Sequence, residues 1–305
     1  MQLAVSNYFD RLPTADCRLV LPTGTADCRL PTDLLPLACC LLHEMIYICA
    51  MQIIDTHNHI YLPEFDADRD EVVERSLAAG VGRIMMPNID SSSVAPMLAA
   101  EERYPGICLP MMALHPTSVK ESFRDELAAV EAALSDHRYY GIGETGIDLY
   151  WDKTFVKAQT VSFRRHLELA EEHDLPVIIH ARESLDLIIE VISEFGNGRV
   201  KGIFHAFPGT AEDACRVTAM GFMIGIGGVV TFRNGRQGEA AIAAGINNIV
   251  LETDAPYLAP VPFRGKRNEA AYLAYVTDKL SELLAITPAE VADRTTENAR
   301  RLFRL

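Results

Sequence analysis

Six side chains that could bind metal ions stand at the downstream ends of five short apolar runs. An imidazole or carboxylate at the end of a buried strand is costly to desolvate unless it is paired or coordinated. One such ending is common, but five in one chain indicate a shared role. The runs are IIDTHNH, GIGETG, PVIIHAR, GIFHAF and IVLETDAP, and they carry His57, His59, Glu144, His180, His205 and Asp254.

The types of these side chains indicate which ions would bind. Imidazole and carboxylate ligands without thiolates suit Zn²⁺ and Mn²⁺, and the carboxylates also suit Mg²⁺. In the first run, the two-residue period of a strand places His57 and His59 on one face, where both can chelate one ion. Two ions bridged by one carboxylate would make a hydrolytic site for phosphoester bonds. We therefore expect two divalent metal ions per subunit, with Zn, Mg and Mn as the alternatives.

A repeated pattern of strands and helices must position these side chains. From Met51 onward, apolar runs alternate with amphipathic, charge-rich segments. No Gly-rich phosphate-binding fingerprint follows the first strand, which disfavours a doubly wound open sheet. Eight strand–helix units in about 250 residues predict an α/β fold, a (β/α)8 TIM barrel with a dinuclear metal site at the C-terminal strand ends. The expected strands are Ile53–Ile60, Arg83–Asn88, Cys108–His115, Tyr139–Gly146, Leu175–Arg182, Val200–Phe207, Phe222–Gly228 and Ile249–Pro256.

The segments between and after these runs are typical of helices, and several carry capping signals. Thr287 precedes Pro288 at an expected first helical position, and glycines such as Gly80 and Gly245 fall just past expected helix ends. The expected helices are Asp66–Ala79, Ser91–Tyr104, Glu121–His137, Thr154–His173, Glu183–Phe195, Ala211–Met220, Gly238–Ala244, Asn268–Leu284 and Pro288–Phe303.

The composition is that of an ordinary soluble globular protein and restricts its partners. The 305 residues are 49% hydrophobic and 23% charged, and no apolar run is long and charge-free enough to span a bilayer. The formal net charge of -14 disfavours generic attraction to nucleic acid, so an anionic substrate needs a local basic cluster or a metal. After residue 50 only Cys108 and Cys215 remain, which suits a reducing cytoplasm. We expect a cytoplasmic monomer or weak oligomer with no membrane partner.

The first fifty residues differ from the rest of the chain. They hold five of the seven cysteines and a near-duplicate, TADCRL, at Thr14 to Leu19 and again at Thr25 to Leu30. Acidic residues dilute any secretory leader, and the cysteine spacings match no zinc pattern. We expect residues 1–50 to be an N-terminal extension, either disordered or a mis-assigned start, and residues 51–305 to form the hydrolase domain.

Seven segments after Met51 match a known family in order and spacing: IDTHNHI, ALHP, GETGID, HAR, HAF, ETDAP and RGKRNE. On these segments the chain resembles the TatD family of metal-dependent hydrolases, within the amidohydrolase-like barrels. The resemblance implies that Glu144 bridges two ions and that a water activated by them is the nucleophile. It implies that Asp254 orients this water or takes its proton, so Asp254 and Glu144 are the expected catalytic residues. The implied ligands are His57, His59, Glu144 and Asp254 for the first ion, and Glu144, His180 and His205 for the second.

Positive charge near the expected active face predicts how substrate is held. One four-residue stretch of this acidic chain contains three cations, Arg264, Lys266 and Arg267. Asn268 follows them as the expected cap of the next helix. Cations beside a helix N-terminus would bind phosphate. A solvated charge run is the alternative, but the match to the family's RGKRNE segment favours a phosphate anchor.

Further substrate contacts are expected on three other segments. Arg182, two residues after His180, is an expected phosphate contact. His115 resembles the family's substrate-side histidine, and it could protonate a leaving alkoxide, contact phosphate or serve structure only. Tyr150 and Trp151 could form an aromatic wall for a nucleobase or could simply pack.

The leading hypothesis, implied by the resemblance, is a deoxyribonuclease that trims single-stranded DNA from its ends in the manner of a 3'-5' exonuclease. Its partner would then be DNA or another phosphate-containing substrate. Ester hydrolysis on a D-aminoacyl-tRNA is the alternative, because it needs the same activated water. Amide hydrolysis is disfavoured, since many amidohydrolase barrels use a carboxylated lysine where this chain has Glu144. A purely structural metal is disfavoured by an open, mixed ligand set.

Overall fold

The computed structural model describes residues 20–21, 24–25 and 53–305. The chain divides into two compact units, Met1–Tyr47 and Ile48–Leu305. In the first unit, β1 (Val20–Leu21) pairs with β2 (Gly24–Thr25) in antiparallel fashion. The expectations for the N-terminal extension fall almost wholly outside the described residues and stay predictions.

The second unit contains eight parallel strands in sequence order. Three form one hydrogen-bonded group, in the order β3-β4-β5, and five form another, in the order β6-β7-β8-β9-β10. The strands are β3 (Ile53–Asp55), β4 (Val81–Pro87), β5 (Cys108–Met111), β6 (Ile142–Asp148), β7 (Val177–Arg182), β8 (Gly202–Phe204), β9 (Met223–Ile226) and β10 (Ile249–Leu251).

Backbone hydrogen bonds join the two groups of strands at both seams. Between β5 and the segment leading into β6, Met112 N donates to Gly141 O at 3.0 Å and Tyr140 N donates to Pro110 O at 2.9 Å. Between β10 and the residues after β3, Thr56 N donates to Leu251 O at 3.0 Å. The strands therefore form a TIM barrel, as predicted.

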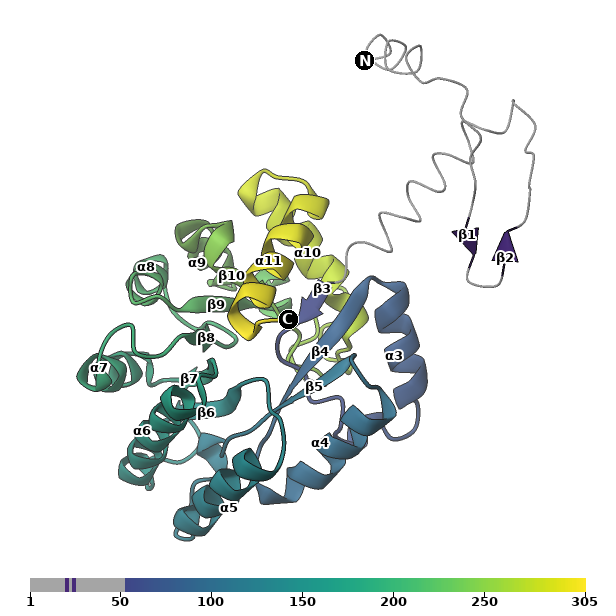
Figure 1. The fold of residues 1–305 in the computed structure, drawn as a ribbon. Helices are drawn as coiled ribbons and strands as arrows, with labels where there is room; N and C mark the ends of the chain where they lie inside the picture. The colour runs from purple at the N-terminus through teal and green to yellow at the C-terminus, as the bar shows by residue number, and fades with distance from the viewer. Residues whose placement is uncertain (1–19, 22–23, 26–52) are drawn as a thin grey trace, which may run out of the picture. The chain divides into compact units, whose positions relative to one another are not determined.

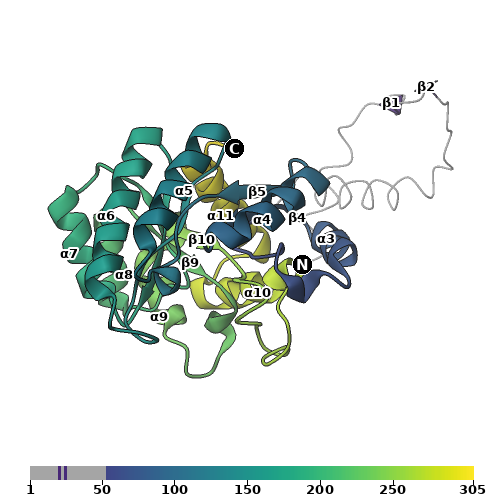
Figure 2. The same ribbon diagram turned by 90° about the horizontal axis from the view of Figure 1, so that it is seen from below.

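Helices surround the ring of strands (Figure 1). The last two, α10 and α11, lie next to each other in both views (Figures 1 and 2). Among the described residues, no helix is long and apolar enough to cross a membrane. The helices are α3 (Arg69–Ala78), α4 (Ser91–Arg103), α5 (Phe123–Asp136), α6 (Val156–His173), α7 (Leu185–Phe195), α8 (Ala211–Ala219), α9 (Gln237–Ala244), α10 (Leu273–Leu284) and α11 (Pro288–Phe303).

Every expected strand and helix is present, but several strands end earlier than predicted. The first was expected to reach Ile60, whereas the ladder of β3 stops at Asp55. Beyond it, Asn58 N donates to Met85 O and His59 N donates to Ala255 O, so the backbone leaves one ladder to meet two neighbours. This departure places the side chains of residues 57–59 over the barrel mouth.

The barrel interior is filled where the strands begin. Seven strands and α11 contribute to one apolar cluster there, so α11 covers the end of the barrel opposite the site. The remaining strand, β6, supplies glycine because there is no room: a Cβ on Gly143 would lie 2.6 Å from Ile178 Cβ. The cluster contains Ile54, Met85, Leu109, Met111, Ile178, Ile203, Met223, Val250, Ala299 and Phe303.

Candidate metal centre

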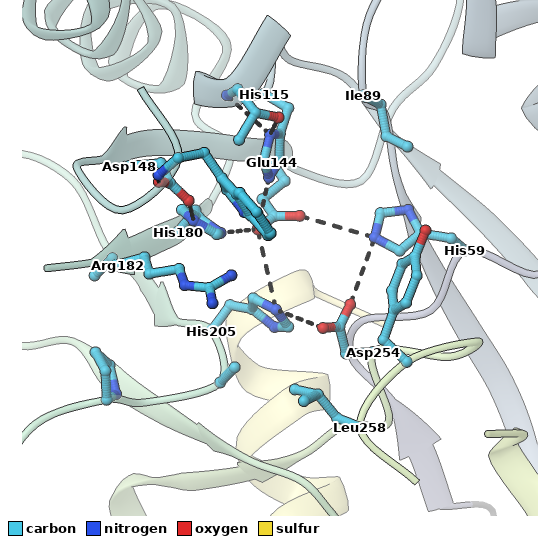
Figure 3. A pocket seen from close by; sticks show the side chains of 16 residues that line it. His59, Ile89, His115, Glu144, Asp148, His180, Arg182, His205, Asp254 and Leu258 are labelled. Carbon is cyan, nitrogen blue, oxygen red and sulfur yellow. Dashed lines mark hydrogen bonds and ion pairs between the residues drawn. The ribbon is translucent and has the colours of Figure 1, made fainter. Parts of the chain in front are cut away.

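The C-terminal strand ends surround a pocket of about 660 Å³. Glu144 lies in its middle, with His59 and Asp254 on one side and His180 and His205 on the other (Figure 3). These are five of the six predicted ligands, and the sixth, His57, is fully buried beside them. The barrel thus brings all six side chains together from five strand ends.

Donor atoms of three other residues lie around His57 Nε2 on the β3 side of the pocket. His57 Nε2 lies 3.2 Å from His59 Nε2 and 3.1 Å from Glu144 Oε2. Asp254 Oδ1 lies 3.8 Å from His57 Nε2 and 3.7 Å from His59 Nε2. Ligand atoms about 2.1 Å from one ion in a tetrahedral arrangement are about 3.4 Å apart. His57, His59 and Glu144 form one group close enough to hold an ion, and Asp254 forms a second such group with His57 and His205.

The other carboxylate oxygen of Glu144 faces the opposite side of the pocket. Glu144 Oε1 lies 2.8 Å from His180 Nδ1, 3.4 Å from His115 Nε2 and 4.0 Å from His205 Nε2. Burial opposes ionisation of Glu144, but His115, His57 and His205 outweigh it and hold its pKa well below the usual range. Glu144 is therefore an anion with one oxygen for each half of the pocket.

Tyr61, which follows the H-x-H pair, determines which nitrogen of His59 is free. The Tyr61 hydroxyl donates its proton to Pro87 O at 2.5 Å, so its oxygen accepts from His59 Nδ1 at 2.9 Å. With the ring proton held on Nδ1, Nε2 keeps its lone pair toward the pocket. Burial and the neighbouring His57 lower the pKa of His59 to about 3, so this ring is neutral.

A carboxylate lies near each of the two histidines of the other half. His180 Nε2 lies 2.9 Å from Asp148 Oδ2, and His205 Nδ1 lies 3.1 Å from Glu252 Oε2. Burial opposes the charged rings, but Asp148 and Glu144 raise the pKa of His180 to about 9. In the same way Glu252, Asp254 and Glu144 raise the pKa of His205 well above its usual value. A carboxylate behind a histidine orients the ring and increases its basicity as a metal ligand.

His115 has the opposite arrangement from His59. The backbone N–H of Thr117 donates to His115 Nδ1 at 3.1 Å, so the proton of a neutral ring must sit on Nε2. This nitrogen faces Glu144 as a donor, although His115, Glu144 and His180 lie close enough together to resemble a metal-binding group. The geometry favours His115 as a hydrogen-bond donor, and His205 lies within metal-ligand reach of His57 and Asp254.

Asp254 is held in a backbone conformation that few non-glycine residues adopt. Its φ of 57° lies in the left-handed region, and its N–H donates to His57 O at 2.8 Å. The residue before it, Thr253, donates from its N–H and its hydroxyl to buried Asp55. Asp55 thereby ties the last strand end to the first and fixes where Asp254 points.

The predicted basic anchor is not at the pocket. Arg267 donates to both carboxylate oxygens of Asp68 at 2.7 and 2.6 Å, and its guanidinium lies over the Phe65 ring. None of Arg264, Lys266 and Arg267 lines the pocket. The expectation that Asn268 caps a helix is wrong, because its side chain donates to Thr253 O, and α10 begins only at Leu273. The segment instead supports the strand end that carries Asp254.

Arg182 does line the pocket, and it has no anionic partner among the described residues. Its guanidinium lies 3.9 Å from the centre of the Tyr150 ring and 5.2 Å from that of Trp151. In Figure 3 the side chain reaches toward His205. An unpaired guanidinium beside Glu144 and Asp254 is suited to hold an anionic group of a substrate.

Three residues that support the site had no predicted role: Tyr61, Asp148 and Glu252. Asp148 and Glu252 belong to the GETGID and ETDAP segments, so their place in a motif was a usable signal. Both are acidic residues in apolar strand ends, where an unpaired carboxylate would be costly. Tyr61 carried no such signal.

A TIM barrel whose strand ends gather imidazoles and carboxylates around one open pocket defines a metal-dependent hydrolase. The family model described as TatD related DNase matches residues 54–304. The chain therefore belongs to the TatD family, and the predicted resemblance is confirmed.

Individual relatives agree with this family. The uncharacterized metal-dependent hydrolase YabD of Bacillus subtilis (strain 168) is 37% identical over 254 residues, which cover 83% of this chain and 99% of YabD. The crystal structure of YJJV, a TatD homologue from Escherichia coli K12, has 29% identity and a TM-score of 0.78, covering 84% of this chain and 99% of that one. A TatD family hydrolase from Entamoeba histolytica, at 21% identity and a TM-score of 0.72 over 83% of this chain and 98% of that one, shows the same fold.

Proposed function

We propose that this protein is a phosphodiesterase that releases nucleotides from the end of single-stranded DNA, as a 3'-5' exonuclease does. The observation that carries the proposal is the division of Glu144 between two groups of histidines, beside the unpaired Arg182. A shared carboxylate between two cation positions is the arrangement used for in-line displacement at phosphorus.

The residues present fit two divalent ions. We assign one to His57, His59, Glu144 and Asp254, and the other to Glu144, His180 and His205. When bound, such ions would lower the pKa of a water molecule and polarise a phosphoryl oxygen. Zn²⁺, Mn²⁺ and Mg²⁺ are the alternatives, because the donors are imidazoles and carboxylates only.

Two side chains are placed to move protons. Burial opposes ionisation of Asp254, but His205, His57 and His59 outweigh it and lower its pKa, so Asp254 is an anion that can accept the proton of the attacking water. His115 presents an N–H at Nε2, which can donate to the leaving oxygen or to a phosphate oxygen. Arg182 would hold the phosphate during both transfers.

The charge distribution favours recognition of a strand end over a long duplex. The net charge of -14 repels a polyanion, and Arg267, one of the three cations expected to counter this, is paired with Asp68. A substrate held through one or two nucleotides in the pocket avoids most of this repulsion. We therefore favour terminal nucleotides over internal sites.

The test is a side-by-side assay of the full chain with single-stranded DNA, duplex DNA, RNA and a D-aminoacyl-tRNA. We expect mononucleotides from single-stranded DNA, loss of release with chelator, and recovery when Zn²⁺, Mn²⁺ or Mg²⁺ is returned. Nucleotide release that survives both chelation and Asp254→Asn would refute the proposal. Turnover of the aminoacyl ester alone would instead support ester hydrolysis at the same site.

A further inference from the structure

We infer that Trp151 is a stacking platform for the base of the terminal nucleotide, a subsite beside the metal centre. The inference rests on the proposed function and adds which part of the substrate is recognised. Trp151 lines the same pocket as Glu144 and Asp254, yet its side chain is 67% exposed. Tryptophan is enriched at interfaces, and this ring offers a large apolar surface at the pocket mouth.

The neighbouring aromatic ring has a different task. Tyr150 is absent from the pocket lining, and the Arg182 guanidinium lies 3.9 Å from its ring centre. The ring of Tyr150 therefore holds Arg182 in place by a cation–π contact. Trp151 meets the same guanidinium at 5.2 Å and the Tyr150 ring edge-to-face at 4.9 Å. Its remaining surface, which is exposed, is open to another planar group.

The loop that carries Trp151 is fixed relative to the metal centre. Asp148 Oδ1 accepts from Tyr150 N at 2.9 Å and from Trp151 N at 3.0 Å. Its other oxygen, Oδ2, contacts His180 Nε2 at 2.9 Å. One buried carboxylate thus sets both the aromatic loop and a predicted metal ligand.

These contacts match the chemistry of one nucleotide. A phosphate between Arg182 and the metal centre would leave its attached base near the exposed indole. Every nucleobase has a π face, so such a platform accepts any base without hydrogen-bond readout. A substrate with an unstacked terminal base, as at a single-stranded end, would use it best.

Binding can be read directly, because Trp151 is the only tryptophan in the chain. The full chain with Zn²⁺ is titrated with thymidine 5′-monophosphate and, separately, with 2-deoxyribose 5-phosphate, which lacks the base. We expect saturable quenching of tryptophan emission by the nucleotide and little quenching by the sugar phosphate. Equal quenching by both probes, or none by either, would overturn the inference.

Turnover gives the second readout. With single-stranded DNA, Trp151→Ala should lower kcat/KM about tenfold, whereas Trp151→Phe, which keeps a π face, should recover most of the loss. With an oligonucleotide whose terminal nucleotide is abasic, the wild-type enzyme should itself lose about this factor, and Trp151→Ala should add little. Tyr275→Ala is the matched control, since Tyr275 is an exposed aromatic residue outside the pocket.

The outcomes separate this subsite from the proposed function. DNA cleavage with Trp151→Ala equal to wild type on both oligonucleotides overturns the subsite and leaves the function standing. Base-dependent quenching without any DNA cleavage supports the subsite and overturns the function. A thermal unfolding midpoint shared by wild type and Trp151→Ala excludes misfolding as the cause of a loss.

Discussion

The two halves of the metal centre hold their histidines in different ways. In the β3 half, His59 contacts an uncharged partner, the hydroxyl of Tyr61, and its pKa is lowered to about 3 by burial and His57. In the β7–β8 half, His180 and His205 each contact a carboxylate, and their pKa values are raised. In the β3 half, His59 is neutral and offers a lone pair. In the β7–β8 half, His180 and His205 hold protons that a metal cation would replace.

This difference separates two roles that the sequence pattern alone combines. A histidine with a neutral partner behind it is a preformed ligand. A histidine between two carboxylates, such as His180 between Glu144 and Asp148, adds one positive charge that offsets part of their negative charge. The β3 half should therefore depend on ring orientation, and the β7–β8 half on charge.

Glu144 is the group that both halves share, so its change should have the largest effect. Glu144→Gln removes the negative charge and turns an amide N–H group toward one half of the pocket. The ring nitrogens of that half then face a group that cannot bind a metal ion. We expect this variant to lose several kcal/mol of transition-state stabilisation. Because about 1.4 kcal/mol corresponds to a tenfold change in rate, kcat should fall at least about 10³-fold. Steady-state kinetics measures this, with unfolding curves as the control. A fall below tenfold would show that Glu144 is not shared.

Asp148→Asn should weaken the β7–β8 half selectively. Asp148 accepts from two backbone N–H groups and from His180, so an amide must turn its N–H₂ toward one of these donors. His180 would then move its proton to Nδ1, the nitrogen that faces Glu144. Changes behind a ligating histidine cost 10–100-fold in metal affinity, and we expect about 100-fold here.

Calorimetric titration with Zn²⁺ checks this prediction. We expect two binding events in the wild-type chain, of which Asp148→Asn weakens one. A matched control is Asp186→Asn, which alters an exposed carboxylate outside the pocket. If both events weaken equally, the halves are not separable and the comparison fails.

Much of the fold and of the ligand set follows from local sequence. Alternation of apolar and amphipathic segments predicts all eight strands, and Thr287 accepts from Glu290 N as its capping position predicts. Because parallel strands of a barrel end on one face, polar residues at those ends had to meet. Strand ends were less predictable, since residues 56–59 leave the ladder to bond with two neighbours.

What could not be predicted depends on long-range pairing. Arg267 is neutralised by Asp68, which lies 199 residues earlier in the chain, so no local pattern reveals that this cation is occupied. Tyr61 reaches Pro87 on the next strand, and only this contact fixes the proton on His59. The positions of the charged groups follow from local sequence, whereas their protonation depends on partners from other strands.

His166 tests whether a neutral buried histidine is enough to make a ligand. It lies on α6, with Nε2 accepting from Leu114 N at 3.1 Å and Nδ1 donating to Ser162 O at 2.8 Å, so both nitrogens are used. Burial lowers its pKa to about 4. The unfolded chain takes this proton near pH 6.5 and the folded chain only near 4, so stability falls as pH drops through this window.

The expected size is roughly 2 kcal/mol of unfolding free energy between pH 7 and pH 5. Urea unfolding at both pH values, with chelator present, measures this. The difference in unfolding free energy between pH 7 and pH 5 should be smaller by this amount in His166→Gln than in wild type. His173→Gln, on the exposed side of the same helix, is the control. An unchanged pH dependence in His166→Gln would mean that His166 is charged in the folded protein.

Tyr61→Phe should have the smallest effect and should act on the β3 half alone. The variant keeps the buried ring but removes the oxygen that accepts from His59 Nδ1. His59 can then carry its proton on Nε2, the nitrogen that faces Glu144 and Asp254. Of the two Zn²⁺ binding events, the one that Asp148→Asn leaves intact should be about tenfold weaker in Tyr61→Phe.

Nitrogen-15 NMR of the His59 imidazole gives a second measurement. It should show the Nδ1–H form in wild type and a mixture of the two forms in Tyr61→Phe. Loss of a packing contact alone would change neither the tautomer of His59 nor one binding event selectively. An unaltered spectrum would therefore mean that Tyr61 serves packing only. Charge alone would then distinguish the two halves.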